Sequence, residues 1–351
     1  MTQMVAKVWN ARSLVAPLMV SVLCAFTPDL AVPQEPPRAA EVVLDDAAKR
    51  ACDRALEWLA SRQNSDGSWS ETSYPHNTAI TSFALLAFMS QGHLPNQGLY
   101  GPEVAKGMRF LLSSAREKDG YLIGSRGGNM YCHAMATLAL AELWGMTGDD
   151  DIKPVLDRAV NLIIGSQSDQ GGWRYEPNQN QADISVTIMQ VMALRAAKNS
   201  GLHVPDQTLK DALAYIQRCY DARSGGFTYQ PGSRGPGFAR TAAGVCVLQL
   251  SGKYDAEQIP RAVQFMKSQF NTRQHFWYGH YYAAHAMHQV GGPEWEEWYA
   301  KIRALLLARQ SPDGSWSTRD LDYNTPGPVY QTSVGVIILS VPTHYLPIFQ
   351  R

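Results

Sequence analysis

The stretch Ser61–Trp69 reads SRQNSDGSW, and it returns near the other end of the chain as ARQSPDGSW at Ala308–Trp316. Both copies follow a stretch with apolar residues at helical spacing, and both carry an Asp-Gly pair that ends a helix and turns the chain. A phrase written twice in this way indicates internal repeats. Weaker copies lie between them, and their aromatic residues recur about every 50 residues, with a shorter last step. The aromatic residues are Trp69, Tyr121, Trp173, Phe227, Trp277 and Trp316.

Each phrase separates two kinds of predicted helix. The stretch before it is amphipathic, with charge on one face and apolar residues on the other, and is therefore expected to face water. The stretch after it is apolar almost all round and rich in Ala, Ser, Thr and Gly, which predicts burial on most sides. The predicted outer helices are 47–63, 102–115, 152–167, 209–220, 259–270 and 298–310, and the inner ones are 77–89, 131–144, 184–197, 240–250, 281–290 and 331–341.

The ends of the repeat array predict a closed ring. An open stack of repeats needs terminal repeats with a polar outer face. Here the first and last repeats are the most alike, and neither is unusually polar. We therefore expect repeat six to pack on repeat one, with the two similar phrases as neighbours. The predicted fold is all-α, an α/α toroid of six helical hairpins over residues 44–351.

Composition and the N-terminal segment limit the classes of protein to which this chain can belong. The 351 residues have a net charge of zero and only 18% charged residues, so no basic field is available to bind nucleic acid. Residues 1–26 combine Lys7 and Arg12 with an apolar run, which predicts an export signal, and residues 27–43 form a Pro-rich linker. We expect an exported protein of the periplasm or cell envelope. An uncleaved anchor is the alternative, which leaves membrane contact open.

The repeat pattern resembles the QW repeats of the terpene cyclase and protein prenyltransferase superfamily. Three phrases match the Gln-x(2–5)-Gly-x-Trp form, namely Gln63–Trp69, Gln167–Trp173 and Gln310–Trp316. The resemblance implies an α/α toroid in which the Gln binds backbone ends of neighbouring helices and the aromatic residue stacks between repeats. It also implies a central cavity at the N-terminal ends of the inner helices. Unpaired N–H groups and positive dipole ends converge there.

The resemblance also gives one candidate acid. Class II cyclases of this superfamily protonate an alkene with an Asp-x-Asp-Asp motif placed just before an inner helix. The best match is Gln181–Ile184, in which Asp183 takes the place of the proton donor while Gln181 and Ile184 replace the flanking acids. Flanking carboxyls help to poise so strong an acid. Asp183 is therefore the catalytic candidate, and capping of the inner helix is its alternative role.

Zinc is the cofactor that the prenyltransferase branch implies, but its Asp-x-Cys motif is absent. Another set, His76, Cys132, His133 and Asp183, falls at the starts of three successive inner helices. Imidazole, thiolate and carboxylate groups would suit Zn²⁺. The alternative is that Cys132 holds a small polar position that recurs across the repeats. We expect no cofactor, with zinc on these four residues as the alternative.

The fifth hairpin is rich in His and Tyr. His280, Tyr281, Tyr282 and His285 are candidates to line the cavity, where aromatic faces would stabilise a cation or hold an apolar guest, and packing is their alternative role. Arg240 lies at the start of the fourth inner helix, where its positive charge opposes the positive end of the helix dipole. This position favours either binding of an anion or a side chain that extends into water. The predicted cavity mouth is completed by His76, Asn77, Tyr131, His133 and Tyr330.

These observations favour one function and leave two alternatives. The leading interpretation is a divergent, terpene-cyclase-like toroid that binds an apolar or prenyl-type ligand in its central cavity, with acid-catalysed isoprenoid chemistry centred on Asp183 as an extension. The alternatives are a non-catalytic scaffold of the cell envelope that binds a peptide or protein, and a zinc-dependent enzyme. A deep aromatic cavity would favour the first, and a filled ring centre would favour the scaffold.

Overall fold

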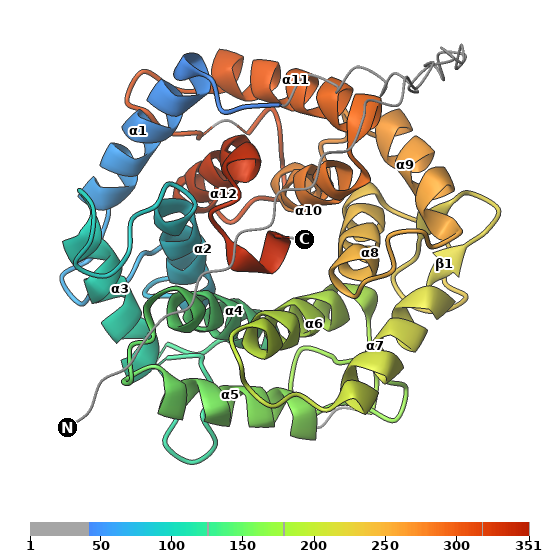
Figure 1. Ribbon diagram of the computed structural model, residues 1–351, viewed down its shortest axis with the longest axis horizontal. Helices are drawn as coiled ribbons and strands as arrows, with labels where there is room; N and C mark the ends of the chain where they lie inside the picture. The colour runs from blue at the N-terminus through green and yellow to red at the C-terminus, as the bar shows by residue number, and fades with distance from the viewer. Residues whose placement is uncertain (1–41, 125, 178–179, 318, 351) are drawn as a thin grey trace, which may run out of the picture. The chain divides into compact units, whose positions relative to one another are not determined.

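The computed structural model divides the chain into two compact units, residues 1–38 and 39–351. The structure describes residues 42–350 except 125, 178–179 and 318. The predicted export signal and most of the predicted linker therefore lie outside the described residues. The second unit, taken by itself, is a double ring of helices with almost no sheet (Figure 1).

The twelve α-helices of the described residues alternate between the two rings (Figure 1). The outer ring consists of α1 (Asp46–Ser61), α3 (Gly101–Ser113), α5 (Lys153–Gly165), α7 (Asp206–Arg218), α9 (Gln258–Ser268) and α11 (Gly292–Arg309). The inner ring consists of α2 (Thr78–Met89), α4 (Met130–Thr147), α6 (Ile184–Asn199), α8 (Phe238–Leu250), α10 (Phe276–Val290) and α12 (Pro328–Ser340). A short antiparallel pair, β1 (Tyr220–Asp221) and β2 (Gly226–Phe227), forms the turn of the fourth repeat.

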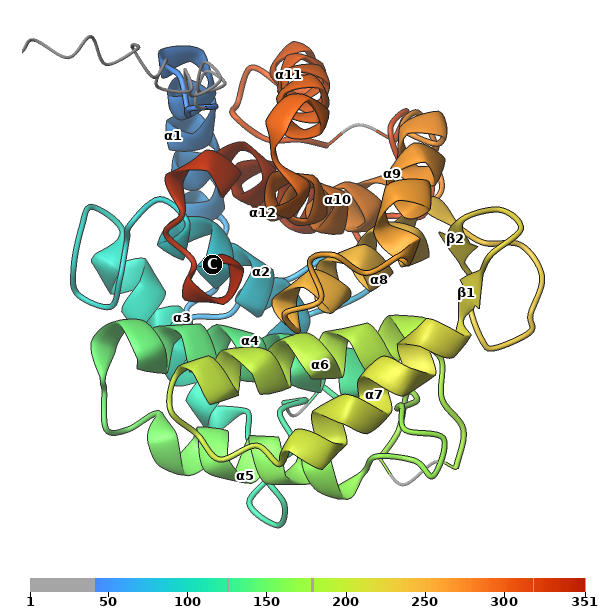
Figure 2. The ribbon, with the colours of Figure 1, turned by 45° about the vertical axis from the view of Figure 1, so that its right-hand side comes forward.

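The inner ring is closed. Each inner helix contacts the next, and α12 returns to contact both α1 and α2 (Figures 1 and 2). The inner helices are buried on nearly every side, as their composition predicts, while the outer helices bury only one face. The predicted all-α toroid of six hairpins is confirmed.

The repeated phrases join neighbouring repeats through their glutamines. The amide of Gln63 donates to the carbonyl of Gly67 in its own turn (3.0 Å) and to that of Glu103 in the next outer helix (2.8 Å). Gln310 makes the corresponding bond to Ala51 of α1 (2.8 Å). Because α1 leads directly into the phrase at 61–69, this bond ties the last repeat to the first.

The repeated phrases need glycine for two reasons, a positive φ angle and the lack of room for a Cβ atom. Gly314 has φ +91°, and a Cβ atom there would lie 2.4 Å from the carbonyl oxygen of Arg54. Gly67 has φ +89° and the same clearance from the carbonyl oxygen of Lys106. Only glycine adopts this conformation so close to another backbone. The turn therefore lies directly on the next outer helix.

The C-terminal segment closes one end of the ring. After α12 the chain forms two short 3₁₀ helices, η1 (Val341–Thr343) and η2 (Pro347–Phe349), and η2 contacts α4 and α6 near the ring axis (Figure 1). The backbone N–H of Ile348 donates to the buried carboxyl of Glu142 (3.2 Å). The carbonyl of Phe349 accepts from the amide of Gln289 (2.7 Å). The C-terminal ends of the inner helices are thereby covered.

Two further properties concern thiols and membranes. Four of the cysteines, Cys52, Cys132, Cys219 and Cys246, are buried free thiols, as expected from their scattered positions. Within the described part of the chain, no helix combines the length and the apolar composition that a membrane crossing needs.

Candidate functional site

A cavity of about 740 Å³ lies at the N-terminal ends of the inner helices. Its wall includes Asn77, the N-cap of α2, and Asn129, the N-cap of α4, together with the first turn of α8 and Tyr330 of α12. The C-terminal segment covers the opposite end of the ring. The cavity is therefore a cup that opens at one face. Its volume lies in the usual range of small-molecule sites, about 300–1,000 Å³.

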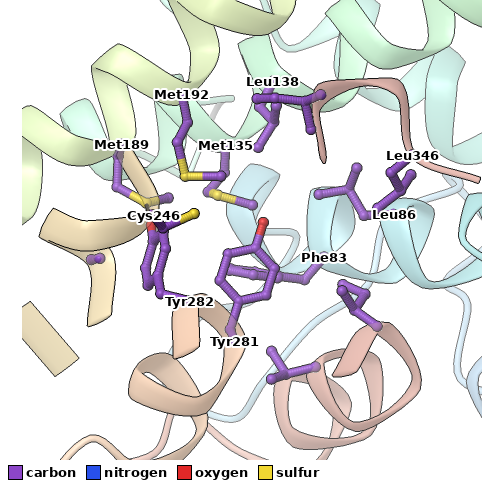
Figure 3. Packing of buried hydrophobic residues seen from close by; sticks show 14 of the residues in the cluster. Phe83, Leu86, Met135, Leu138, Met189, Met192, Cys246, Tyr281, Tyr282 and Leu346 are labelled. Carbon is purple, nitrogen blue, oxygen red and sulfur yellow. Dashed lines mark hydrogen bonds between the residues drawn. The ribbon is translucent and has the colours of Figure 1, made fainter. Parts of the chain in front are cut away.

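The bottom of the cup is apolar. Phe83, Met135 and Met189 line it, and the ring of Phe83 stands edge-on to Tyr330, with centroids 4.9 Å apart. Figure 3 shows Phe83 and Met135 beside Tyr281, and Met189 beside Tyr282. Tyr281 packs edge-on against Phe83 at 5.7 Å. No charged group faces this part of the cavity among the described lining residues. An apolar chain would be desolvated there.

Tyrosines form the upper wall. Tyr131 and Tyr175 stack with ring centroids 6.2 Å apart, and the hydroxyl groups of Tyr175 and Tyr229 are hydrogen-bonded (3.0 Å). The guanidinium of Arg174 lies over the rings of both Tyr175 and Tyr229, at 5.5 and 5.7 Å from the centroids. These contacts hold the tyrosines in fixed positions, which favours recognition of a rigid or apolar guest.

Two charged side chains, Arg240 and Asp322, line the cavity among the described residues. Asp322 accepts from the backbone N–H groups of Asn324 (2.9 Å) and Trp277 (3.3 Å), so its charge stabilises a helix start. Arg240 donates to the carbonyl of Gly235 (2.6 Å) and makes no ion pair within the described residues. Burial lowers the pKa of Arg240.

The structure brings together part of the predicted site. Five predicted residues line the cavity: Asn77, Tyr131, Cys132, Arg240 and Tyr330. The cavity therefore lies where the resemblance placed it, at the N-terminal ends of the inner helices. Seven predicted residues do not line it: His76, His133, Asp183, His280, Tyr281, Tyr282 and His285. Their positions have separate physical reasons.

His133 occupies a structural position of the repeat. In the first repeat the hydroxyl of Thr81, one turn into α2, accepts from the backbone N–H of Trp69 (3.0 Å), and Thr332 does the same for Trp316 (3.0 Å). In the second repeat Nδ1 of His133 accepts from the N–H of Leu122 (3.0 Å), while Nε2 donates to a carbonyl of α5. Burial lowers the pKa of His133 to about 4, so it is a neutral packing group rather than a mouth residue.

In the second repeat, the polar side chain that accepts from the repeated phrase is therefore His133, one residue after the predicted Cys132. The alternative to a zinc ligand placed Cys132 at a small polar position that it would share with Thr78, Ser185, Thr241 and Thr332. The hydrogen bonds instead place His133 in register with Thr241 and Thr332. Cys132 instead lies on the cavity wall, where the amide of Asn77 contacts its sulfur at 3.5 Å. A helix turns about 100° per residue, so a shift of one position exchanges a buried side chain for a lining one.

The fifth hairpin is packed rather than open to the cavity. His280 is fully buried among the rings of Phe238, Phe276 and Trp298, and its Nε2 donates to the carbonyl of Phe270 (3.1 Å). The predictions that His280 lies at the mouth and that Tyr281 and Tyr282 line the cavity are wrong. The two tyrosines form the layer beneath the apolar bottom, and they are 1% and 0% exposed.

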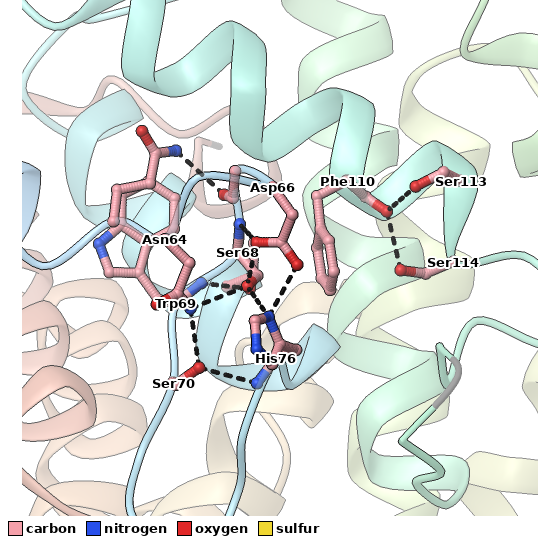
Figure 4. A network of polar contacts seen from close by, with 12 residues as sticks. Asn64, Asp66, Ser68, Trp69, Ser70, His76, Phe110, Ser113 and Ser114 are labelled. Atoms are coloured by element: carbon pink, nitrogen blue, oxygen red, sulfur yellow. Dashed lines mark hydrogen bonds and ion pairs between the residues drawn. The ribbon is translucent and has the colours of Figure 1, made fainter.

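His285 and His76 lie away from the cavity for different reasons. His285 is further along α10, where its ring stacks on Phe349 of the C-terminal segment at 3.4 Å. His76 stays beside the first repeated phrase, where Nδ1 contacts the carboxylate of Asp66 (2.7 Å) and the hydroxyl of Ser68 (2.9 Å) (Figure 4). Both acceptors meet the same ring nitrogen, so this Ser-His-Asp group lacks the relay arrangement of a nucleophilic triad.

The structure does not assemble the alternative zinc set. Within the described residues, no three His, Cys, Asp or Glu side chains lie close enough together to hold a metal ion. Both ring nitrogens of His133 are used by backbone groups, and Asp183 is buried away from the cavity wall.

Asp183 caps α6. Its carboxylate accepts from the backbone N–H of Val186 (3.0 Å), and its second oxygen lies 3.6 Å from the guanidinium of Arg174. The side chain is 0% exposed, and burial raises its pKa. A group in this position supports the tyrosine wall through Arg174. Its role as a proton donor stays a prediction.

Replacing Asp183 with alanine is expected to lower the free energy of unfolding by about 1–2 kcal/mol, because the cap of α6 is lost. Asp183→Asn keeps a capping oxygen, so we expect a smaller loss. Urea unfolding of the two variants measures the difference. Equal stability of Asp183→Ala and the wild type would remove the capping role. If Asp183 is an acid, Asp183→Asn should stay folded and lose turnover.

Sequence reasoning missed several residues of the wall. Tyr175 and Tyr229 each follow the aromatic residue of a repeated phrase by two positions, so the repeat itself carried a signal for them. The bottom residues Phe83, Met135 and Met189 belong to helices that are apolar all round. Such helices give no periodic signal that separates the cavity face from the packed face.

The fold is similar to that of solved enzymes that act on different substrates. A variant of the alpha-1,6-mannanase of Salegentibacter sp. HEL1_6 in complex with alpha-1,6-mannotriose superposes with a TM-score of 0.66 at 10% identity, over 87% of this chain and 100% of that chain. A variant of the type II terpene cyclase MstE from Scytonema in complex with geranylgeranyl dihydroxybenzoate gives a TM-score of 0.62 at 12% identity, over 86% and 98%. At such identities the likeness concerns the fold alone.

Two curated enzymes match parts of the sequence. Squalene–hopene cyclase of Bradyrhizobium diazoefficiens is 36% identical over 77 residues, which are 18% of this chain and 11% of that enzyme. Lanosterol synthase of Mus musculus is 26% identical over 145 residues, or 40% and 19%. The chain thus matches less than a fifth of the length of either relative. The family model of the prenyltransferase alpha-alpha toroid domain matches residues 39–276, more than half of the chain, and the protein belongs to this family.

Proposed function

We propose that the protein binds an apolar ligand of prenyl type in its central cavity. The observation that carries this proposal is the cup of about 740 Å³, closed at one end, with Phe83, Met135 and Met189 at its bottom. Burial of a hydrocarbon chain there would be favourable by about 25 cal/mol per Å² of apolar surface. The tyrosine wall would fix the chain's orientation.

Binding, rather than acid catalysis by Asp183, is the part of this function that the geometry supports. The carboxyl of Asp183 is fully buried and does not line the cavity. The carboxylate that does line it, Asp322, already accepts from two backbone N–H groups. Glycoside hydrolysis usually needs a pair of carboxyl groups flanking the substrate. We therefore do not extend the mannanase activity of the structural neighbour to this chain.

Peptide or protein binding is the second candidate. It is supported by large aromatic side chains at the mouth, because Tyr74 is 47% exposed and Tyr175 is 37% exposed. Exposed tyrosines are common in binding surfaces for proteins. Native mass spectrometry of the purified protein separates the two candidates, since a retained small apolar molecule supports the first and a retained peptide supports the second.

Replacing Ala79 with tryptophan should weaken binding of a prenyl probe. Ala79 lines the cavity and is only partly buried, so the larger side chain would enter the cup rather than the core. We expect the Kd for farnesol to rise at least about tenfold, or by about 1.4 kcal/mol. Isothermal titration calorimetry measures both proteins.

A matched control is Ala60→Trp. Ala60 is also partly buried on a helix, but it belongs to α1 and does not line the cavity. Farnesol should bind this variant as it binds the wild type. Equal binding of farnesol to Ala79→Trp and to the wild type would contradict the proposed function.

A further inference from the structure

The cavity wall has two chemically different sides. On the side of α2, α4 and α6, several polar side chains of the wall are hydrogen-bonded within the protein. Asn77 and Asn129 cap their helices, and Tyr175 bonds to Tyr229. On the side formed by α8, α10 and the loop before α12, two buried polar atoms have no hydrogen-bond partner, namely Nε of Arg240 and the hydroxyl of Thr325. The hydroxyl of Tyr278 lies on the same side, close to the hydroxyl groups of Tyr131 and Tyr282.

The first turn of α8 adds unsatisfied donors to the same side. Its N-cap is Gly237, which has no side chain to accept from the helix, and no acidic residue occurs in the first turn. The inner helices α2, α4 and α6 are all capped by a side chain, from Asn77, Asn129 and Asp183. The residues of this turn, from Gly237 to Arg240, line the cavity. The uncapped turn therefore borders the space in which a ligand would lie.

Arg240 is the cation of this side. Of its five N–H donors, the bond to the carbonyl of Gly235 uses one. Arg240 lies near the phenol groups of Tyr229 and Tyr278, which affect its ionisation, and no carboxylate is within ion-pair distance among the described residues. The side chain as a whole is only partly buried, but its Nε is buried, and a buried donor without a partner is costly. An acceptor supplied by a ligand would remove this cost.

We propose that the ligand of this cavity carries a single carboxylate at its polar end, bound by Arg240 and the first turn of α8. The hydroxyl of Tyr278 lies beside this carboxylate, and the apolar chain extends toward Phe83 and Met135. The ligand class is therefore a long-chain or isoprenoid carboxylic acid. This inference rests on the proposed function, because it assigns the polar end of the same cavity.

One carboxylate matches the charge of this wall better than a diphosphate. Arg240 is the one Lys or Arg among the described lining residues, and Asp322 contributes a negative charge to the same wall. A guanidinium pairs with a carboxylate through two parallel N–H donors. A diphosphate would bring further negative charge without a second cation to balance it.

Three probes with the same farnesyl chain test this inference: farnesol, farnesoic acid and farnesyl diphosphate. For the wild type we expect farnesoic acid to bind at least about tenfold more tightly than farnesol and farnesyl diphosphate. In Arg240→Met the advantage of farnesoic acid over farnesol should disappear, while farnesol itself still binds. Tyr278→Phe should reduce that advantage in part. Calorimetry at fixed salt gives each Kd, and thermal unfolding checks that the variants fold.

Arg234→Met is the matched control, because Arg234 is in the same loop as Gly235 but is exposed and does not line the cavity. It makes the same charge change and should keep the preference for farnesoic acid. Equal affinity of the wild type for farnesol and farnesoic acid would overturn the carboxylate assignment and leave the proposed function standing. Tightest binding of farnesyl diphosphate would overturn the single-carboxylate assignment as well. If none of the three probes binds, the proposed function itself fails.

Discussion

Trp316→Ala is expected to lower the free energy of unfolding by about 3–5 kcal/mol, which is a large part of the stability of a typical domain. Trp316 is 0% exposed, and its indole N–H donates to the carbonyl of Leu306 in α11 (2.9 Å). Its ring lies against Gly335 of α12, where a Cβ atom would approach it to 2.8 Å. The substitution therefore opens a cavity and leaves a buried carbonyl without its donor. Urea unfolding followed by fluorescence and circular dichroism measures the change.

The contacts of Trp316 make this loss a test of how tightly the last hairpin is packed, because they join α11 to α12. The phrase that contains it is bonded to α1 through Gln310, so it lies where the last repeat meets the first. Tyr323→Ala is the control, because Tyr323 is 66% exposed in the segment that follows, and we expect a change of no more than about 0.5 kcal/mol. A loss below about 1 kcal/mol for Trp316→Ala would show that the aromatic residue of the repeated phrase contributes little to the packing of the last hairpin.

The fold was predictable because the same pattern of helices recurs in every repeat. An amphipathic helix followed by an apolar helix occurs six times, and a glycine turn with an aromatic residue separates the two in five of the six repeats. In the fifth repeat the connection has no glycine, and Trp277, which the spacing predicts to precede the inner helix, lies within α10. The closed ring followed from the likeness of the two ends. These features depend on local sequence and on the repeat period, which a single sequence contains.

The site was less predictable because it depends on which face of each inner helix points inward. The sequence predicted that Asn77, Tyr131, His133 and His280 all lie at the cavity, and only the first two line it. Composition alone does not distinguish a lining residue from a packed one. The difference lies in contacts with other repeats, such as the bond from the N–H of Leu122 to His133. A His that replaces a recurring Thr is a signal that could have been used, once the helices were aligned.

The C-terminal segment illustrates contacts that a local pattern cannot show. Glu142 is an isolated acid in an apolar stretch of α4, and its partner, the N–H of Ile348, is 206 positions away. The sequence marks Glu142 as unusual but does not identify what it binds. The structure explains it as the anchor of the segment that closes the cup.

Glu142 is expected to make the stability of the protein fall as pH rises from 4.5 to about 8. Burial raises the pKa of its carboxyl from 4.5 to about 8. Below pH 4.5 the group is neutral in both states. Between these values the unfolded chain has released the proton that the folded protein retains. Stability is therefore lost by up to about 1.4 kcal/mol per pH unit, and by roughly 4 kcal/mol over the whole window.

Glu142→Gln isolates this effect because it retains an acceptor for the N–H of Ile348 but cannot ionise. Urea unfolding at several pH values should show that the free energy of unfolding of the variant, relative to that of the wild type, rises steadily between pH 5 and 8. Subtracting the two curves cancels other titrations, including that of His285, whose pKa burial lowers. Glu117→Gln makes the same charge change at an exposed site and should follow the wild type. If Glu142→Gln also follows the wild type at every pH, then Glu142 is ionised at no cost in the folded protein, and the C-terminal segment is held by its other contacts, such as the bond from Gln289 to Phe349.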